Sequence, residues 1–215
     1  MRFAYLHGFA SGPGSTKAQF FRARLAQRGI ELQVPDLAPD FTNMTIASQL
    51  RVVDALLDAA ATILFGSSLG GYLAALAAAR RPDRVPALVL MAPAFGFAAR
   101  WERRVGATAM AEWRARGTAP VFHYGREREE PLSIALLDDA RSYPEEPDPP
   151  CPALVLHGRR DDAVPLDAAE RFAARRPALR RLVVYDAGHE LTEATGAMWE
   201  ETAAFLRRAW ETGVR

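Results

Sequence analysis

Only one of the 215 residues is a cysteine, and only one is a lysine. The single thiol, Cys151, excludes a disulfide framework within the chain and a metal site built from cysteines, and it is typical of a reducing compartment. The chain has 26 acidic and 27 basic residues other than histidine, and the two signs are mixed along its length. No basic stripe therefore indicates a nucleic-acid partner or an anionic lipid surface.

The sequence also lacks a long apolar run. The longest, LGGYLAALAAA at 69–79, is far shorter than the roughly 18 residues that a membrane span needs. The opening stretch MRFAYLHGF contains one arginine and a short apolar strand, which is too brief for the apolar core of a signal peptide. We therefore expect a cytoplasmic protein without a membrane span.

Nothing in the composition divides the chain into parts. It has no Gly/Ser linker, no block of like charge and no internal repeat, and 49% of its residues are hydrophobic. A chain of this length and composition can bury one sizeable core. The sequence predicts a single domain over residues 1–215.

Short apolar segments alternate with helical patterns. Segments typical of buried strands lie at 2–6, 31–35, 62–66, 86–91, 153–157 and 181–186. Helical patterns lie at 16–28, 45–60, 69–81, 167–176 and 196–210. This alternation predicts a doubly wound α/β fold, with a mainly parallel sheet of about six strands and helices on both faces. Ligands of such sheets bind at the carboxyl ends of the strands, so the loops there should carry the chemistry.

A long interval between MAP at 91–93 and the segment at 153–157 interrupts the alternation. Loops longer than about 15 residues without their own structure are uncommon inside a compact domain. This interval contains tryptophans and tyrosines and ends in the proline-rich acidic run SYPEEPDPPCP. We expect a small folded lid insertion over 94–150, closed by an exposed return strap.

Two adjacent serines, Ser67 and Ser68, follow an apolar run in LFGSSLGGY at 64–72. Gly66, Ser68 and Gly70 match G-x-S-x-G on an expected turn from strand to helix, the context in which this pattern presents a nucleophile. The positions two before and two after the nucleophile must be small, so that strand and helix can approach each other. Only Ser68 has glycines at both positions. We predict that Ser68 is the nucleophile and Ser67 a structural residue; the alternative is a glycine-rich turn that serves packing alone.

A serine nucleophile needs a general base. The sequence has four histidines, and His189 is preferred because it lies in a glycine-flanked loop after the last expected strand. His7 and His157 each precede a glycine at a strand end, where a hydrogen bond to loop backbone is the simpler interpretation. His123 lies in the insertion, where surface or lid packing is the simpler interpretation.

The base in turn needs an orienting carboxylate. The loop HGRRDDAVP offers Asp161 and Asp162 after the fifth expected strand. The common pattern D-x-x-V-P, counted back from Val164 and Pro165, favours Asp161, with Asp162 as a solvated neighbour or loop cap. Three loops at three different strand ends would then supply the nucleophile, the base and the acid.

An oxyanion hole completes the expected site. Its first donor is the backbone N–H of Leu69, because N–H groups at the start of a helix are unpaired and the helix dipole favours negative charge there. The second comes from the loop after the first strand, with Phe9 N–H preferred and Ala10 N–H as the alternative. These loops should face each other, because the first and third strands flank the reversal in strand order.

These motifs resemble those of the α/β-hydrolase superfamily. YLHGF at 5–9 with 15–17, GSSLGGY at 66–72 and the terminal pair at 188–189 look like the small bacterial YqiA-like esterases, and the chain order of serine, aspartate and histidine is that of the superfamily. The likeness covers nearly the whole chain, without the early antiparallel strands. The loop HGRRDDAVP looks more like general carboxylesterases and peptidase-like hydrolases.

The resemblance implies hydrolysis of a small-molecule acyl ester or thioester through an acyl-enzyme, without a cofactor or a metal. Amidase, peptidase-like and acyltransferase reactions use the same acyl-enzyme and stay open. A catalytically silent binding module would keep the nucleophile turn and lose a partner, yet all three partners are present. The stretch GFASGPGSTK at 8–17 is a weak match to a phosphate loop, because its lysine follows the hydroxyl residues instead of preceding them.

The insertion should supply the acyl pocket. It leaves the sheet at AFGF, beside the nucleophile turn, and its aromatic residues and Met110 offer apolar area. Phe95 and Trp113 are the candidate substrate-binding residues. The alternative is that Trp101 and Trp113 only anchor the insertion to the domain.

Overall fold

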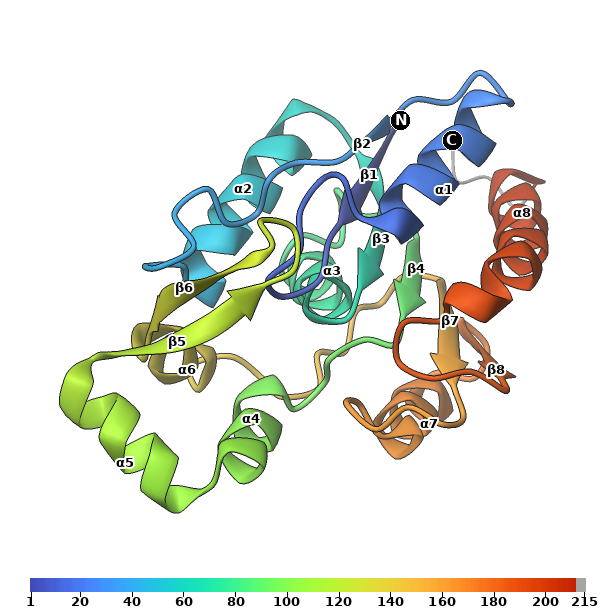
Figure 1. Ribbon diagram of the computed structural model, residues 1–215. Helices are drawn as coiled ribbons and strands as arrows, with labels where there is room; N and C mark the ends of the chain where they lie inside the picture. Colours follow the sequence, from blue (N-terminus) through green and yellow to red (C-terminus); the bar gives the residue numbers. More distant parts are fainter. Residues whose placement is uncertain (212–215) are drawn as a thin grey trace.

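The computed structural model describes residues 1–211 of the chain (Figure 1), so residues 212–215 of the expected domain lie outside it. Within the described part, one parallel sheet of six strands has the order β2-β1-β3-β4-β7-β8. The strands are β1 (Arg2–Leu6), β2 (Leu32–Gln33), β3 (Thr62–Ser67), β4 (Leu88–Met91), β7 (Ala153–Gly158) and β8 (Arg180–Tyr185).

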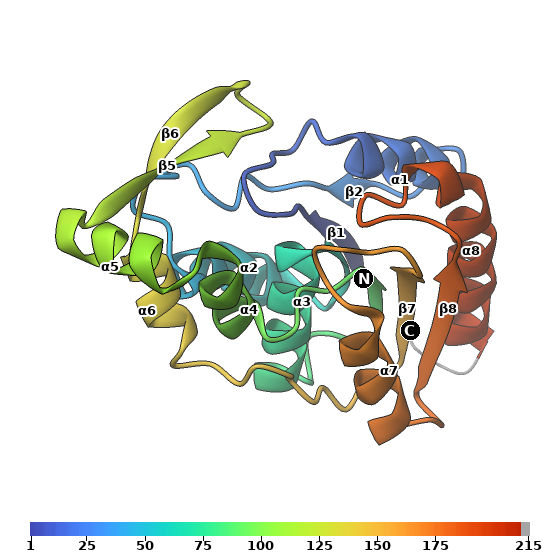
Figure 2. The same ribbon diagram turned by 60° about the horizontal axis from the view of Figure 1, so that its bottom comes forward.

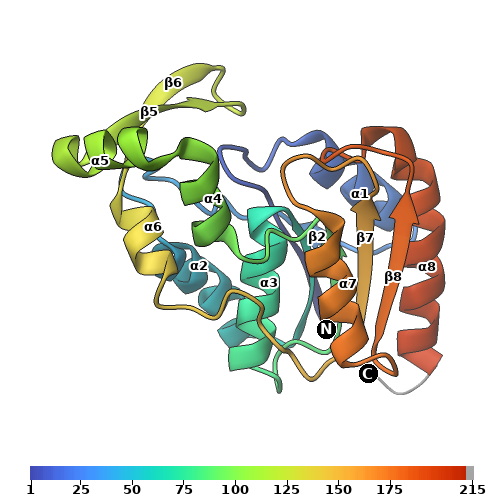
Figure 3. The ribbon, with the colours of Figure 1, turned by 90° about the horizontal axis from the view of Figure 1, so that it is seen from below.

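Helices cover both faces of this sheet (Figure 3). On one face lie α1 (Thr16–Ala26) and α8 (Thr195–Glu211), the latter preceded by the short 3-10 helix η1 (Thr192–Ala194). On the other lie α2 (Ile46–Ala59), α3 (Leu69–Arg80) and α7 (Leu166–Arg175). The prediction of a doubly wound α/β fold is therefore confirmed.

Alternation along the strands creates two cores. Ala4 and Leu6 of β1 face the core beneath α2 and α3, whereas Phe3 and Tyr5 face the core beneath α1 and α8. This follows from the two-residue period of a strand. The central strand β3 is buried along its whole length, as its unbroken apolar sequence predicts.

The second strand is shorter than expected. A strand was predicted over 31–35, but only Leu32 and Gln33 pair with β1, opposite Phe3 and Ala4. β2 is at the edge of the sheet, and Pro35 lacks the N–H that would continue the pairing. The other predicted strands and helices differ from the observed ones by a few residues at their ends.

The interval between β4 and β7 is folded, as expected, although its elements were not foreseen. It contains α4 (Phe97–Val105), α5 (Ala107–Arg116), an antiparallel hairpin of β5 (Thr118–His123) and β6 (Arg128–Ser133), and α6 (Ala135–Ala140). These elements lie at the end of the molecule away from α8 (Figure 2). The strap that follows is less exposed than predicted, because Pro147 and Pro149 are buried.

Candidate active site

Ser68 stands at the sharp turn between β3 and α3. Its φ of 52° and ψ of −117° place a non-glycine residue in a strained backbone conformation. The turn is held by hydrogen bonds from Ser68 N–H to Met91 O (2.9 Å) and from Ala94 N–H to Ser68 O (2.9 Å). Ser67, by contrast, is a buried residue of β3.

The glycines around Ser68 are needed for close backbone approach. A Cβ at Gly66 would collide with the backbone of Gly70, and a Cβ at Gly70 would collide with the Leu6 carbonyl at the end of β1. Strand, turn and helix can therefore adopt this geometry only without side chains at the two positions. This is the physical reason that the sequence pattern singles out Ser68.

A chain of hydrogen bonds joins Ser68 to two loops at other strand ends. His189 Nε2 lies 3.0 Å from Ser68 Oγ, and His189 Nδ1 lies 2.8 Å from Asp161 Oδ2. The side chain of His189 is 18% exposed, whereas that of Asp161 is fully buried. The three residues predicted from the sequence are thus brought together, and Asp162 is exposed beside them.

The Asp161 carboxylate is held by several donors. Its Oδ1 accepts the N–H groups of Ala163 (2.9 Å) and Val164 (2.7 Å), and its Oδ2 faces His189 and His157. Burial by itself raises the pKa of a carboxyl, but here the hydrogen bonds from the two histidines and Val164 outweigh it and hold the pKa of Asp161 well below its usual range. These hydrogen bonds therefore favour the ionised form of Asp161.

Two loops approach closely to bring the acid and the base together. A Cβ at Gly158, at the end of β7, would collide with the carbonyls of Ala187 and Gly188 in the loop after β8. Arg160 N–H also donates to Ala187 O at 3.0 Å. Backbone contact between these loops, and not a long flexible reach, places Asp161 beside His189.

The loop after β1 passes directly beside the serine. A Cβ at Gly8 would lie 3.5 Å from Ser68 Cβ. Leu69 is the first residue of α3, where an N–H has no acceptor within the helix. Among residues 1–211, no acceptor is recorded for the N–H of Phe9, the preferred second donor, and Ala10, the alternative, has a positive φ of 51°.

His7 orders this loop. Leu37 N–H donates to His7 Nε2 (3.1 Å), so the proton lies on Nδ1, which donates to Gly8 O (3.0 Å). Burial lowers the pKa of His7, which keeps Nε2 free to accept. His7 therefore forms hydrogen bonds with loop backbone, as the sequence analysis expected. His123 is buried against Phe41, with ring centroids 4.7 Å apart.

The aromatic residues of the insertion pack in two ways. Phe95 is 1% exposed and stacks on Phe172 of α7, and Trp113 is 4% exposed and donates its indole N–H to Leu132 O at 2.9 Å. Both side chains are packed inside the protein. For Trp113, this is the placement expected if it only anchors the insertion to the domain. Trp101 is only partly buried, and its ring meets that of Phe9 edge-on at 4.5 Å between centroids. Sequence reasoning did not foresee this contact between the insertion and the loop after β1.

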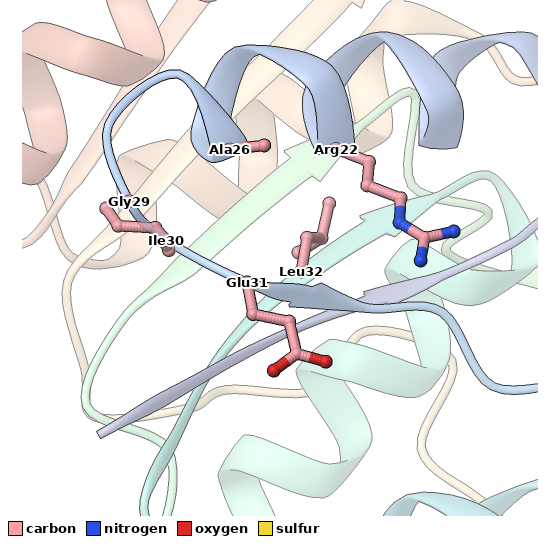
Figure 4. Close-up of a pocket in the computed structure, with 6 residues that line it drawn as sticks. All are labelled: Arg22, Ala26, Gly29, Ile30, Glu31 and Leu32. Atoms are coloured by element: carbon pink, nitrogen blue, oxygen red, sulfur yellow. The ribbon is translucent and has the colours of Figure 1, made fainter.

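A surface hollow of about 300 Å³ lies elsewhere, between the end of α1 and the edge strand β2 (Figure 4). It is lined by Arg22, Ala26, Gly29, Ile30, Glu31 and Leu32. None of these residues belongs to the loops that carry Ser68, Asp161 and His189, so this hollow is not part of the candidate site. In residues 1–211 no helix is long and apolar enough to cross a membrane.

Comparison with known proteins places the chain in a family. A model of the Uncharacterised protein family (UPF0227) matches residues 2–206. A curated relative, the mitochondrial palmitoyl-protein thioesterase ABHD10 of Bos taurus, is 32% identical over 130 residues, which is 59% of this chain and 42% of the relative. The match thus spans less than half the length of that protein.

Solved structures share the whole architecture. The mouse alpha/beta hydrolase domain-containing protein 10 has a TM-score of 0.80 at 20% identity, over 96% of this chain and 89% of its own. Est1E from Butyrivibrio proteoclasticus, solved with ferulic acid bound, has a TM-score of 0.78 at 20% identity, over 96% and 90%. At such identities the likeness shows the fold, which is that of the α/β hydrolases.

Proposed function

The chain belongs to the Uncharacterised protein family (UPF0227) and has the α/β-hydrolase fold, and from these premises we propose that it is a serine hydrolase of carboxylic acyl esters or thioesters. One observation carries the proposal: Ser68, His189 and Asp161 form a continuous hydrogen-bonded chain at a strained turn. A buried anion, an imidazole and a hydroxyl in this order are what activation of a serine requires.

Each group has a role in this proposal. Ser68 Oγ attacks the acyl carbon and gives its proton to His189 Nε2, while Asp161 accepts the Nδ1 hydrogen bond and stabilises the imidazolium that forms. His189 then protonates the leaving alcohol or thiol, which leaves an acyl group on Ser68. Water attacks this acyl-enzyme with His189 as the base, and the acid and free Ser68 are released.

The oxygen of the tetrahedral intermediate needs donors while it is negatively charged. The N–H groups of Leu69 and Phe9 are assigned to it, because Leu69 begins α3 and Phe9 lies in the loop beside Ser68. The dipole of α3 adds to the stabilisation. No metal or organic cofactor takes part in this scheme, because nucleophile, base and donors all come from the chain.

The insertion over 94–150 is proposed as a lid over the acyl group. Trp101 of the insertion meets the ring of Phe9 in the oxyanion loop. The names of the similar proteins agree with an acyl substrate, since one is a palmitoyl-protein thioesterase and another was solved with ferulic acid. Amidase and acyltransferase reactions on the same acyl-enzyme are the alternatives.

Covalent labelling tests the proposal directly. A fluorophosphonate should modify the wild-type protein at Ser68, as mapped by peptide mass spectrometry, and should not label Ser68→Ala. A panel of p-nitrophenyl esters of graded length and acyl-CoA thioesters then identifies the substrate class. Hydrolysis in Ser68→Ala should fall by about 10⁴ or more, whereas Ser67→Ala, the matched control, should lose far less. Labelling at Ser67, or at neither serine, would overturn the assignment.

A further inference from the structure

A second histidine, His157, lies buried beside Asp161. It lies in β7, directly before Gly158, and its side chain is fully buried. Its Nε2 is 2.8 Å from Val164 O and 3.3 Å from Asp161 Oδ2. Both neighbours are acceptors, so the Nε2 proton is shared between them.

The other ring nitrogen of His157 fixes the tautomer. Within residues 1–211 no partner is recorded for the buried Nδ1. A proton there would be buried without an acceptor, which is costly, whereas a bare nitrogen is tolerated more easily. His157 therefore carries its hydrogen on Nε2, where it faces the carboxylate.

This donor completes the surroundings of Asp161. Val164 donates its N–H to Asp161 Oδ1 at 2.7 Å and accepts the proton of His157 through its carbonyl. His157, Val164 and Asp161 thus form a closed ring of contacts at the turn after β7. The carboxylate oxygen Oδ2 is left between two imidazoles, those of His157 and His189.

We propose that His157 is a positioning residue of the hydrolase, acting through Asp161 to hold Oδ2 toward His189 and to limit the negative charge that His189 feels. The inference rests on the proposed function. A carboxylate that lacks this donor can rotate, which lowers turnover. It also becomes a stronger acceptor for protonated His189, which favours the form of His189 that cannot accept the Ser68 proton.

The charged and titratable groups around Asp161 make this effect observable. His189 faces it from the loop after β8, His157 faces it from β7, and Arg100 of α4 interacts with it electrostatically from the insertion. Arg100 keeps its charge over the working pH range, so it adds a constant background. A change at position 157 should therefore show on the acid side of the rate profile.

Two substitutions separate positioning from packing. His157→Gln places an amide nitrogen as many bonds from Cβ as Nε2 is, so it retains a donor, whereas His157→Leu removes the donor and keeps an apolar side chain. His157→Leu should lower kcat about 10-fold to 100-fold, the range for one hydrogen bond to a charged group, with KM nearly unchanged. In this variant the acid limb of the kcat/KM profile should move to higher pH. His157→Gln should keep most of kcat and the wild-type acid limb.

The controls keep the test decisive. Circular dichroism and thermal unfolding verify that each variant is folded. If His157→Leu does not fold, His157→Asn takes its place with the same expectation, because its shorter amide does not reach Asp161. The proposal is overturned if the variant without the donor keeps the wild-type kcat and the wild-type acid limb of the pH profile. It is also overturned if the variants with and without the donor lose activity equally and their acid limbs do not shift.

Ser68→Ala is measured in parallel. If it retains wild-type activity, or if the wild type cleaves no ester or thioester, the proposed function itself has failed. In that case the NMR resonance of the His189 Nδ1 proton still tests the role of His157. If this resonance is the same in the wild type and in the variant without the donor, the positioning role is overturned.

Discussion

Lys17 Nζ donates to both the backbone carbonyl (2.6 Å) and the carboxylate (2.9 Å) of Glu190, the residue after His189. This single lysine of the chain is 8% exposed and joins α1 to the loop after β8 across 173 positions of sequence. The carbonyl bond restrains the backbone next to His189. Lys17 is thus placed to restrain the loop that carries the imidazole.

Lys17→Met should lower kcat of ester hydrolysis by about 10-fold to 100-fold, because one hydrogen bond from a charged donor is lost at the His189 loop. Glu190→Ala is the matched control: it removes a carboxylate that is 74% exposed and leaves the carbonyl bond intact. Exposed ion pairs contribute little, so its effect should be small. Equal effects of the two variants would show that the carboxylate, and not the carbonyl, is the important partner.

Asp161→Asn should reduce turnover by orders of magnitude, because an amide at this position favours the wrong tautomer of His189. Asp162→Asn, at an exposed neighbouring site, should keep most of the activity. Steady-state rates on one p-nitrophenyl ester, measured for both variants at neutral pH, decide between them. The reverse ranking would move the acid by one residue.

Much of the fold could be predicted because the strands are buried on both faces. β3 and β7 are mostly apolar and buried along their whole length, and Gly29 and Pro82 mark the ends of two of the helices, so element order and fold class follow directly. The edge strand β2 was overestimated, since the apolar pattern does not show where pairing stops. The insertion was recognised only as folded, because its hairpin strands β5 and β6 are mostly polar and exposed.

The candidate site was predictable where backbone constraints leave a trace in the sequence. Gly66 and Gly70 mark the only serine that fits the turn, and the spacing to Val164 marks Asp161. Contacts between distant side chains leave no such trace. The approach of Trp101 to Phe9 depends on loop conformations that no local pattern encodes. His157 and Asp161 are only four residues apart, yet their contact depends on how the turn between them folds. The catalytic roles themselves stay predictions.

The return strap gives a prediction about acid stability. Asp148 is bound by Arg176, and also by Arg180, whose side chain is fully buried and lies over the ring of Phe172 at 3.9 Å. The hydrogen bonds from Arg176, opposed by partial burial and helped by Arg180, lower the pKa of Asp148 to about 2. In the unfolded chain the ordinary pKa is about 3.9. A lowered folded pKa stabilises the protein above about pH 4, and this contribution is lost as the pH falls toward 2.

Asp148→Asn should therefore lower the free energy of unfolding by about 1–2 kcal/mol at pH 7, less than for a fully buried pair because the Asp148 side chain is 44% exposed. The difference from wild type should shrink between pH 4 and pH 2.5 in urea titrations. Asp83→Asn, which removes an exposed ion pair with Arg84, is the control and should change little at any pH. A difference that is constant with pH would mean that packing, and not charge, explains the loss.

The last prediction concerns the aromatic contact beside the oxyanion loop. Trp101 is only partly buried and reaches Phe9, whose backbone is assigned to the oxyanion hole, so its ring is the part of the insertion best placed to line an acyl pocket. Each methylene that enters an apolar pocket contributes up to about 0.8 kcal/mol, or nearly fourfold in kcat/KM. Trp101→Ala should therefore flatten the rise of kcat/KM with acyl-chain length while short esters react nearly as before.

Two other variants separate a pocket wall from an anchor. Trp113 is buried and hydrogen-bonded to Leu132, so Trp113→Ala should destabilise the protein by about 3–5 kcal/mol, the usual cost of truncating a buried aromatic side chain. Tyr124, 72% exposed in the same insertion, is the matched control, and Tyr124→Ala should change neither stability nor chain-length preference. If Trp101→Ala folds and keeps the wild-type profile across p-nitrophenyl esters, its ring does not line the pocket. The apolar wall would then have to be sought elsewhere, first around the Phe9 loop, because Phe95 and Trp113 are packed inside the protein and Phe122 and Tyr124 are exposed on the hairpin.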